Sequence, residues 1–294
     1  MLLFLALGLA LDSAKVGISP AVKQVVQGGL DRIDPARISA LDALSNSGDA
    51  SATELLGEIY LGGLGGLAAD RKRACTYFER ASLLRPDSAH NYANCHYHKQ
   101  IVGWDATKAR IFYQRGIDGG WPSSRCALGI MLVEGTGGER DIKTGISLCR
   151  QAAESGDADA QTDLGNYLLE GKVVAKNIVE ARKWYALAAT QKQANAALVL
   201  GQIYWNGDGT PVDHEAAARW WKVAYAAGRK DAAGLLVRAL FRRVIGERGG
   251  KSVIVDRSLL PELAIWLQHA ATDEPDPVKR KLFADSLASL TTAH

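Results

Sequence analysis

Histidines and cysteines gather in one stretch of the chain, and these residue types can bind a metal ion or act as nucleophiles. His90, Cys95, His96 and His98 lie close together, and Cys95 and His98 would share one face of a helix. Zinc in proteins takes nitrogen and sulfur ligands, but a structural zinc site needs four of them, and no second cluster with ligand spacing is present. The sequence therefore predicts no metal site and no cofactor.

Two other motifs come close to catalytic or phosphate-binding signatures. The run Gly145-Ile-Ser147-Leu-Cys149 resembles a nucleophile elbow but lacks the last glycine, and it lies in a stretch with helical spacing. The glycines at positions 62–66 do not follow a strand, so a phosphate-binding loop is not indicated. Paired carboxylates and a Ser-x-x-Lys arrangement are also missing. We therefore expect a protein that is not an enzyme.

The segments that carry these residues repeat along the chain. The dipeptides Leu128-Gly129, Leu164-Gly165 and Leu200-Gly201 recur every 36 residues (164 − 128 = 200 − 164 = 36), and each is followed by a loop glycine. The same register reaches three less regular copies, led by Leu56-Gly57, Tyr92-Ala93 and Leu236-Val237. Stacked copies of one unit form an extended docking surface and seldom a catalytic pocket.

Each unit has two halves with helical spacing. We call the first residue of each dipeptide the leading residue. A small residue stands 17 positions after it and opens the second apolar stripe, as in Ala109, Gly145, Ala181 and Ala217. Helix N-cap residues precede the second halves at Asp70, Asp141, Asn177 and Asp213. Each unit is thus predicted as helix A, a glycine loop and a capped helix B. The predicted fold is an all-α, α/α superhelical solenoid of about six helix-hairpin repeats with helical caps at both ends.

This pattern resembles the Sel-one-like repeat, a relative of the tetratricopeptide repeat with a longer loop between its helices. The resemblance is carried most fully by Ala196, Leu200, Gly201, Tyr204, Gly207, Gly209, Asp213, Ala217, Trp220, Trp221 and Ala224. The unit that starts at Ala160 departs from the pattern at Leu168, where a tyrosine is expected, and has lost its second loop glycine. The resemblance covers residues 52–228, with a degenerate extension to residue 271, and implies a solenoid used for protein–protein contact.

The chain ends carry different patterns from the repeats. Residues 1–14 are predicted as a signal peptide or as an apolar N-terminal helix, with no lysine or arginine before the apolar run. Residues 20–50 are predicted as capping helices at 20–31 and 35–44, the second capped by Asp34. Residues 51–228 are predicted as five repeats. Residues 229–294 would hold a degenerate sixth unit, an irregular stretch at 246–255 and helices at 260–271 and 277–290.

The state of the four cysteines depends on the compartment. If the chain is exported to the periplasm or secreted, disulfides can form, whereas in the cytoplasm thiols stay reduced. Cys75 and Cys95 lie on facing sides of consecutive helices, so their pairing is our first choice. Cys126 and Cys149 share a unit, but Cys126 would face the groove, which makes that bridge the weaker prediction. The alternative is four buried thiols that pack as small apolar side chains.

The partner is predicted to be a protein or a peptide. The formal net charge is only +3 and no basic run alternates with aromatic residues, which argues against nucleic acid. Helix A would line the inner wall of the array, and its residues two before, two after and five after the leading residue point away from helix B. These groove residues are His90, Asn94, Tyr97, Ile130, Thr162, Asn166, Leu198, Gln202, Trp205, Arg238 and Phe241.

Two other functions stay open at this level. Exported relatives with cysteine-stapled repeats imply, by resemblance, a protein that binds or hydrolyses β-lactams. A cytosolic scaffold is the second alternative, in which the apolar N-terminal run is part of the core. The sequence predicts no transmembrane span, because the run at residues 1–11 is shorter than the roughly 20 residues that cross a bilayer. It does not predict the oligomeric state.

Overall fold

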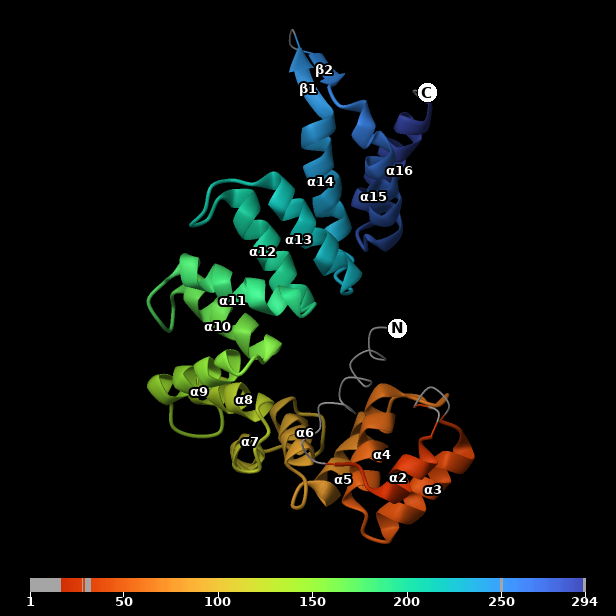
Figure 1. Ribbon diagram of the computed structural model, residues 1–294, viewed down its shortest axis with the longest axis vertical. Coiled ribbons are helices and arrows are strands. Elements are labelled where there is room, and N and C mark those ends of the chain that lie inside the picture. The colour runs from red at the N-terminus through yellow and green to blue at the C-terminus, as the bar shows by residue number, and fades with distance from the viewer. Residues whose placement is uncertain (1–16, 28, 30–32, 249–250, 293–294) are drawn as a thin grey trace. The chain divides into compact units, whose positions relative to one another are not determined.

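The computed structural model describes residues 17–27, 29, 33–248 and 251–292, so the predicted signal segment at residues 1–14 lies outside the described residues. The chain divides into two compact units, residues 1–160 and 161–294. In each unit consecutive helices pair as hairpins (Figure 1). This arrangement confirms the predicted fold class, an all-α solenoid of helix-hairpin repeats. The domain boundaries at residues 50 and 228 remain predictions from the sequence pattern.

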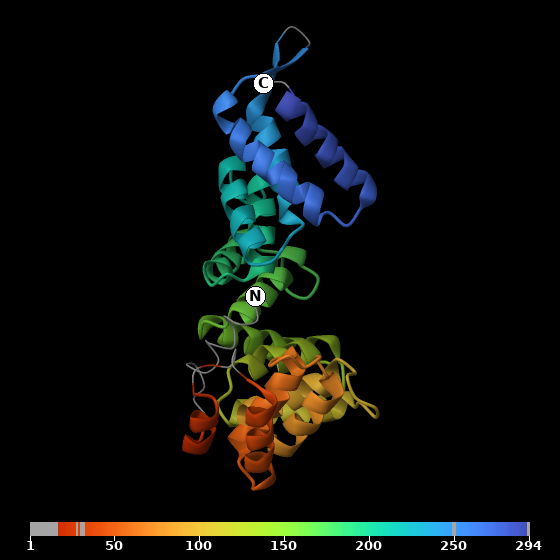
Figure 2. The ribbon, with the colours of Figure 1, turned by 90° about the vertical axis from the view of Figure 1, so that its right-hand side faces the viewer.

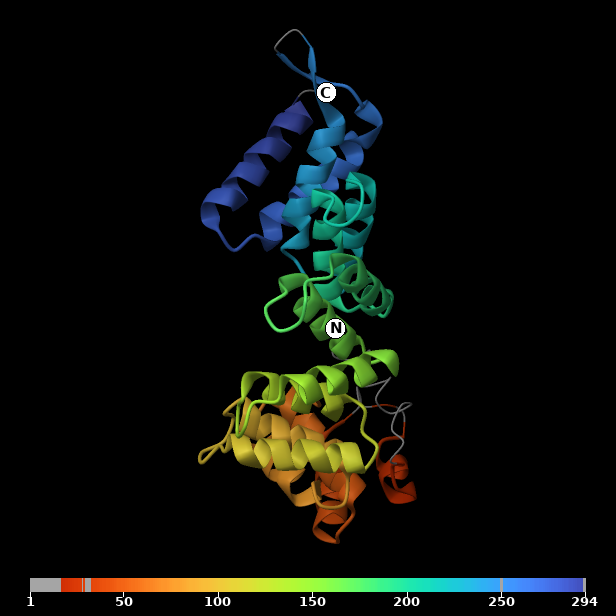
Figure 3. The same ribbon diagram turned by 90° about the vertical axis from the view of Figure 1, so that its left-hand side faces the viewer.

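The first unit contains the N-terminal helices and the first three hairpins. Its helices are α2 (Pro20–Val25), α3 (Pro35–Asn46), α4 (Ala50–Gly62), α5 (Arg71–Ala81), α6 (Pro86–Tyr97), α7 (Ala106–Asp118), α8 (Ser123–Glu134) and α9 (Ile142–Glu154). The most extensive helix–helix contacts in this unit are those between the hairpin partners α4 and α5, α6 and α7, and α8 and α9. Figure 3 shows these pairs from another side.

The second unit begins in the first turn of α10 (Ala158–Glu170) and continues with α11 (Ile178–Thr190), α12 (Ala194–Asn206), α13 (His214–Ala226) and α14 (Ala232–Val244). A two-stranded hairpin follows, made of β1 (Ile245–Arg248) and β2 (Lys251–Ile254). The short 3-10 helix η2 (Arg257–Leu259) leads into α15 (Leu260–Asp273) and α16 (Pro277–Thr292). These last two helices pack side by side (Figure 2).

The predicted helix caps are present. The side chains of Asp70, Asp141, Asn177 and Asp213 each accept a hydrogen bond from a backbone N–H in the first turn of the following helix. Such caps satisfy amide groups that a helix start leaves unpaired. The Asn177 side chain also donates to the Glu180 carboxylate, while the Asn177 backbone N–H donates to the Leu168 carbonyl oxygen. The beginning of each helix B is therefore encoded locally.

Small residues let the two helices of a hairpin approach closely. A β-carbon added to Gly129 would lie 2.5 Å from the backbone oxygen of Gly145, and the same holds in reverse. In the other units the glycine of helix A faces a ring of helix B: Gly57 meets Phe78, Gly165 meets Tyr185, and Gly201 meets Trp221. The glycine of helix A therefore faces an aromatic ring in three of these hairpins and a second glycine in the hairpin of α8 and α9.

The second loop glycine has a different role. Gly137 lies against the first turn of α7, where an added β-carbon would come within 2.4 Å of the Ala106 carbonyl oxygen. A β-carbon added to Gly65 would lie 2.8 Å from the Ile33 carbonyl oxygen, and one added to Gly209 would lie 3.3 Å from the Ile178 side chain. The loops that hold Gly137 and Gly209 thus contact the start of helix B in the preceding repeat. The loop that holds Gly65 contacts Ile33, just before α3. The Gly-x-Gly motif contributes to stacking between repeats as well as to the turn.

Two predictions at the ends of the chain are corrected by the structure. The helix predicted at residues 20–31 ends at Val25, because its apolar positions give way to Gln27 and a run of glycines. The stretch at residues 246–255, predicted as irregular, contains the antiparallel pairing of β1 and β2. There β-branched residues resume after the glycines at positions 249–250, which favours a hairpin over a loop.

Candidate binding surface

The predicted groove residues are distributed over both units. The first unit holds His90, Asn94 and Tyr97 on α6 and Ile130 on α8, and the second unit holds the remaining seven. Most of these side chains are only partly buried, which leaves them accessible to a partner. The buried exceptions are Thr162 and Trp205.

Two asparagines occupy the same register in different repeats and make the same hydrogen bond. The Tyr113 hydroxyl donates to Asn94 Oδ1 at 2.6 Å, and the Tyr185 hydroxyl donates to Asn166 Oδ1 at 2.7 Å. Both tyrosines are buried on helix B, and burial raises the pKa of each hydroxyl, which therefore stays protonated and donates. In both repeats, the tyrosine on helix B therefore fixes the orientation of the asparagine amide group on helix A.

His90 is held against the next repeat. Its Nδ1 lies 3.1 Å from the Ser124 hydroxyl oxygen on α8, and its ring lies 5.4 Å from the ring of Tyr113. A serine next to a histidine can form a nucleophilic pair, but Ser124 is completely buried and packs against Gly116. A substrate would not reach its hydroxyl group. The contact is suited to positioning α8 against α6.

His90 keeps some exposed surface but is largely surrounded by protein atoms, and this leads to a pH prediction. Burial lowers its pKa to about 4, although Asp157 and Asp87 partly oppose this shift and His98 adds to it. Between pH 6.5 and 4 the unfolded chain therefore binds a proton that the folded chain does not. The free energy of unfolding should fall as the pH decreases through this window, by up to about 3 kcal/mol from this group.

Denaturant unfolding between pH 4 and 7.5 tests this prediction in the wild type and in His90→Gln, which keeps a hydrogen-bonding group beside Ser124 but does not titrate in this range. The difference in unfolding free energy between the two proteins should shrink or reverse toward low pH. A difference that is constant across the range would contradict the buried, neutral imidazole.

The aromatic residues of the second unit form a stack around Trp205. Its ring lies 4.3 Å from His214 and 5.4 Å from Trp221, and the Arg238 guanidinium lies 4.9 Å above it. Only 8% of Trp205 is exposed, so the prediction that it projects into the groove as an anchor is wrong. Large rings five positions after the leading residue lie close enough to helix B to pack on its aromatic residue. Arg238, rather than the indole, is the exposed group at this place.

The other predicted residues of the second unit have local partners. Gln202 donates to the Asn206 side chain at 2.7 Å, and the Leu198 carbonyl oxygen accepts from Trp221 Nε1 at 3.2 Å. Phe241 packs on the apolar cluster between α14 and α15 and remains partly exposed. In the first unit, the Tyr97 hydroxyl lies 3.3 Å from a carboxylate oxygen of Glu134.

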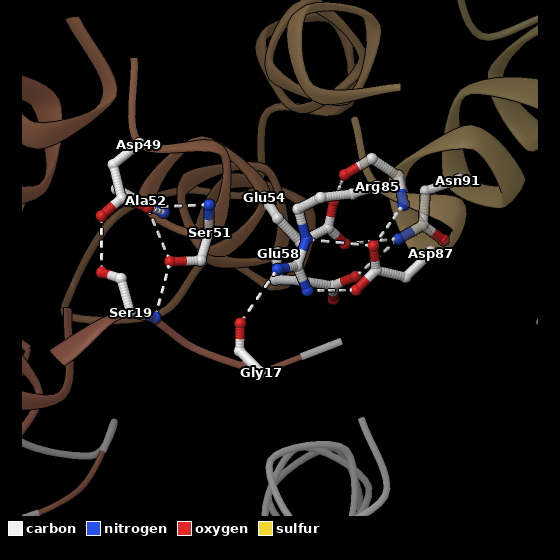
Figure 4. A network of polar contacts seen from close by, with 11 residues as sticks. Gly17, Ser19, Asp49, Ser51, Ala52, Glu54, Glu58, Arg85, Asp87 and Asn91 are labelled. Carbon is white, nitrogen blue, oxygen red and sulfur yellow. Dashed lines mark hydrogen bonds and ion pairs between the residues drawn. The ribbon is translucent and has the colours of Figure 1, made fainter. Parts of the chain in front are cut away.

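A buried polar network was missed by the sequence interpretation. Glu54 and Glu58 on α4 both accept from the Asn91 side chain on α6, at 3.0 and 2.9 Å, and Glu54 also accepts from Ser88 (Figure 4). Beside them Arg85 pairs with Asp87 and donates to the Gly17 carbonyl oxygen. Glu54 and Glu58 stand two residues before and two after the leading residue Leu56, so the rule used for the other repeats would have found them.

The carboxyl groups of this network share a buried site. Burial raises the pKa of Glu54 well above its usual range, and the nearby Asp87 and Glu58 raise it further, while Arg85 acts in the opposite direction. Burial also raises the pKa of Glu58. Proton binding is therefore favoured at these two groups. The network joins α4 to α6, and through Arg85 it also contacts Gly17 (Figure 4).

Both predicted cysteine pairs are disulfides. Cys75 on α5 is bonded to Cys95 on α6, with a Cα–Cα distance of 6.0 Å, and this bridge links two repeats. Cys126 on α8 is bonded to Cys149 on α9, with a Cα–Cα distance of 4.0 Å, and this bridge closes one hairpin. Cys149 stands where Tyr113 and Tyr185 stand in their repeats, so its side chain points at helix A and reaches Cys126 there. Disulfides are typical of oxidising compartments.

The histidines near Cys95 do not converge with it. His96 is buried, lies edge-on to the Tyr92 ring, and accepts at Nδ1 from the Asp105 backbone N–H at 3.0 Å. In the described part of the chain, no three His, Cys, Asp or Glu side chains come together in a way that could hold a metal ion. None of its helices has the length and apolar character of a bilayer-crossing segment.

These features define a helix-hairpin repeat protein of the α/α solenoid class. Five successive segments, residues 50–85, 86–121, 122–157, 158–192 and 194–228, match the family model described as Sel1 repeat. The chain therefore belongs to the Sel1 repeat family, the family that its sequence pattern resembles. Sel1 repeat proteins typically bind other proteins.

Similar solved structures support the fold. A Sel1 repeat protein from Oxalobacter formigenes has a TM-score of 0.60 and 22% identity, covering 82% of this chain and 93% of that one. A protective antigen of uropathogenic Escherichia coli with an SLR fold has a TM-score of 0.61 and 22% identity, covering 86% of this chain and 56% of that one.

Part of the chain is also similar in sequence to a plant protein. An F-box protein of Arabidopsis thaliana is 32% identical over 78 residues, which span 26% of this chain and 20% of that protein.

Proposed function

We propose that this protein is an adaptor, without enzymatic activity, that binds a protein or a peptide along the exposed faces of its A helices. The observation that carries the proposal is the repeated contact of Tyr113 with Asn94 and of Tyr185 with Asn166. Each tyrosine occupies the acceptor oxygen and so orients the amide NH₂ group outward from the hairpin. Amides held in one orientation lose little conformational freedom when they bind a peptide carbonyl group.

We also propose that the protein works in an oxidising compartment, as a periplasmic or secreted factor in envelope signalling or assembly. The two disulfides support this part of the proposal, because cytosolic thiols are kept reduced. N-terminal sequencing of the native protein tests it. A mature chain that starts after about residue 14 is expected, and a mature chain that retains Met1 or Leu2 would favour the cytosolic scaffold.

A matched pair of triple variants tests the binding surface. The inner-face variant combines Tyr97→Ala, Ile130→Ala and Gln202→Ala, which avoids truncating the buried Trp205. The control variant combines Leu187→Ala, Ile111→Ala and Gln151→Ala, at exposed positions on the B helices. A few anchor residues, with tyrosine prominent among them, supply most of the binding energy at an interface, so the inner-face variant should bind the partner at least roughly tenfold more weakly.

The measurement has two steps. Partners that co-purify with the wild type from its native source are identified first, and the affinity of each for the three proteins is then measured with purified components. The control variant should retain wild-type affinity. If both triple variants bind the partner as the wild type does, or if only the control loses binding, the A-helix faces are not the binding surface.

A further inference from the structure

Two arginines one helical turn apart stand on the exposed side of α14 in the second unit. Arg238 is two residues after the leading residue Leu236, the register that Asn166 and Gln202 occupy in the preceding repeats. Arg242 follows four residues later, and both side chains are exposed. Residues four apart lie next to each other on a helix, and two like charges there repel each other. An anion bound by both guanidinium groups would relieve this repulsion.

The described residues do not provide that anion. Among the side chains that the structure describes, which leave out those of residues 247–253 and 290–294, no hydrogen bond or ion pair joins Arg238 or Arg242 to a carboxylate. The neighbouring Arg243 differs, because it is near acidic groups. Hydrogen bonds from Ser258 lower the pKa of the Asp256 carboxyl group, and the positive charge of Arg243 lowers it further. The pKa of Glu262 is lowered mainly by Lys222 and to a smaller extent by Arg243.

Trp205 holds the Arg238 guanidinium in place. The guanidinium carbon lies 4.9 Å from the indole centroid, and the indole is itself fixed between His214 and Trp221. A guanidinium held over an aromatic ring by a cation–π contact can still donate its N–H groups to a carboxylate. Arg238 is thus oriented before any partner arrives, which reduces the conformational cost of binding.

We propose that this face of α14, which we call the Arg238–Arg242 face, binds an acidic segment of the protein partner, with aspartate or glutamate side chains paired to both arginines. The inference rests on the proposed function and specifies the chemistry of the partner. The two positive charges of the face are complementary to two carboxylates, and bidentate arginine–carboxylate pairs are among the stronger charge-assisted contacts.

An acidic peptide fits this face better than a nucleic acid does. The residues that neighbour it in the groove register, Leu198, Gln202 and Phe241, are uncharged. A protein that tracks a phosphate backbone needs a longer basic groove with exposed aromatic platforms. Here the indole of Trp205 is covered by Arg238 and cannot stack on a base.

Nuclear magnetic resonance of the full chain labelled with nitrogen-15 tests the proposal. The probe is an N-acetylated, C-amidated octapeptide of alternating glutamate and alanine, titrated to about 1 mM so that weak binding is detected. The side-chain Nε–H signals of Arg238 and Arg242, assigned from single lysine variants, should shift, and so should the indole N–H signal of Trp205. The same peptide with glutamine in place of glutamate should cause no shift.

Variants establish which charges are responsible. Arg238→Gln combined with Arg242→Gln should weaken binding of the acidic octapeptide by at least about tenfold. Arg219→Gln, an exposed arginine on α13 that pairs with Glu215, removes one positive charge elsewhere and should leave the affinity unchanged. Equal losses in both variants would show that the peptide responds only to total charge, and would overturn the proposal.

Two further probes separate the alternative ligands. An octapeptide of alanine and serine with a free C-terminal carboxylate tests recognition of a chain end, and an oligothymidylate of equal charge tests nucleic acid. Tighter binding of either probe at these arginines would overturn the assignment to acidic side chains, as would the absence of any shift with the acidic peptide. If the inner-face triple variant loses the native partner while Arg238→Gln/Arg242→Gln retains it, only this inference fails and the proposed function stands.

Discussion

Removing the two disulfides is expected to destabilise the first unit by about 6 kcal/mol. Each bridge closes a loop of similar length, with sequence separations of 20 and 23 residues, and loops of this length contribute about 3 kcal/mol each through the entropy of the unfolded chain. Small domains are stable by only about 5–15 kcal/mol in total. Reduction should therefore leave the first unit marginally folded or unfolded.

Paired variants separate the two contributions. Cys75→Ala with Cys95→Ala, and Cys126→Ala with Cys149→Ala, each remove one bridge and leave a small apolar residue at a buried position. Guanidinium unfolding should show a loss of about 3 kcal/mol for each pair, and reductant should have no further effect on the variant that lacks all four cysteines. Mass spectrometry of the native protein without reduction should find no thiol that can be alkylated. Four alkylatable thiols, or unchanged unfolding midpoints, would contradict the bridged state.

Replacing Trp221 by alanine is expected to have the next largest effect. The side chain is almost completely buried, its indole packs directly on Gly201, and its Nε1 donates to the Leu198 carbonyl oxygen. Truncation of a buried tryptophan to alanine typically costs about 3–5 kcal/mol, because it removes apolar contacts and leaves a cavity. The loss should be felt first by α12, α13 and their neighbours, since a repeat contacts mainly adjacent repeats.

Hydrogen exchange of backbone amides measures both the size and the location of this effect. Amides of α12 and α13 in Trp221→Ala should exchange much faster than in the wild type, while those of α4 and α5 should keep their protection. Trp104→Ala is the matched control, because this tryptophan is 46% exposed and should lose little stability. Uniform loss of protection throughout the chain would show that the protein unfolds as one unit instead.

The repeat architecture could be predicted from the sequence because its determinants are local and recur. The leading leucines, the glycine that meets helix B and the N-cap aspartates are each needed in every hairpin, so they return at one period. The cysteine pairing followed from the same register. Cys75 and Cys95 were placed on facing sides of consecutive helices, and the structure joins them. The weaker prediction, Cys126 with Cys149, is also bonded, because Cys149 replaces an aromatic residue that points at helix A.

The exposure of single residues was harder to predict than their register. The position of Trp205 was predicted correctly to lie on helix A, but the ring is large enough to turn back onto Trp221, so it became part of the core. Glu54 and Glu58 occupy the groove register of their repeat, but their shared contact with Asn91 on α6 is not encoded by that periodicity. The hairpin of β1 and β2 breaks the repeat pattern and left no periodic signal.

Site-specific photo-crosslinking tests most directly whether the partner binds the exposed faces of the A helices. A benzoylphenylalanine placed at Ile130 or Gln202, on those faces, is compared with one placed at Ile111 or Leu187, on exposed faces of B helices. Cross-links to the native partner from Ile130 or Gln202, and none from the B-helix positions, are the predicted result. Cross-links that form only from Ile111 or Leu187 would contradict the account and place the binding surface on the B helices.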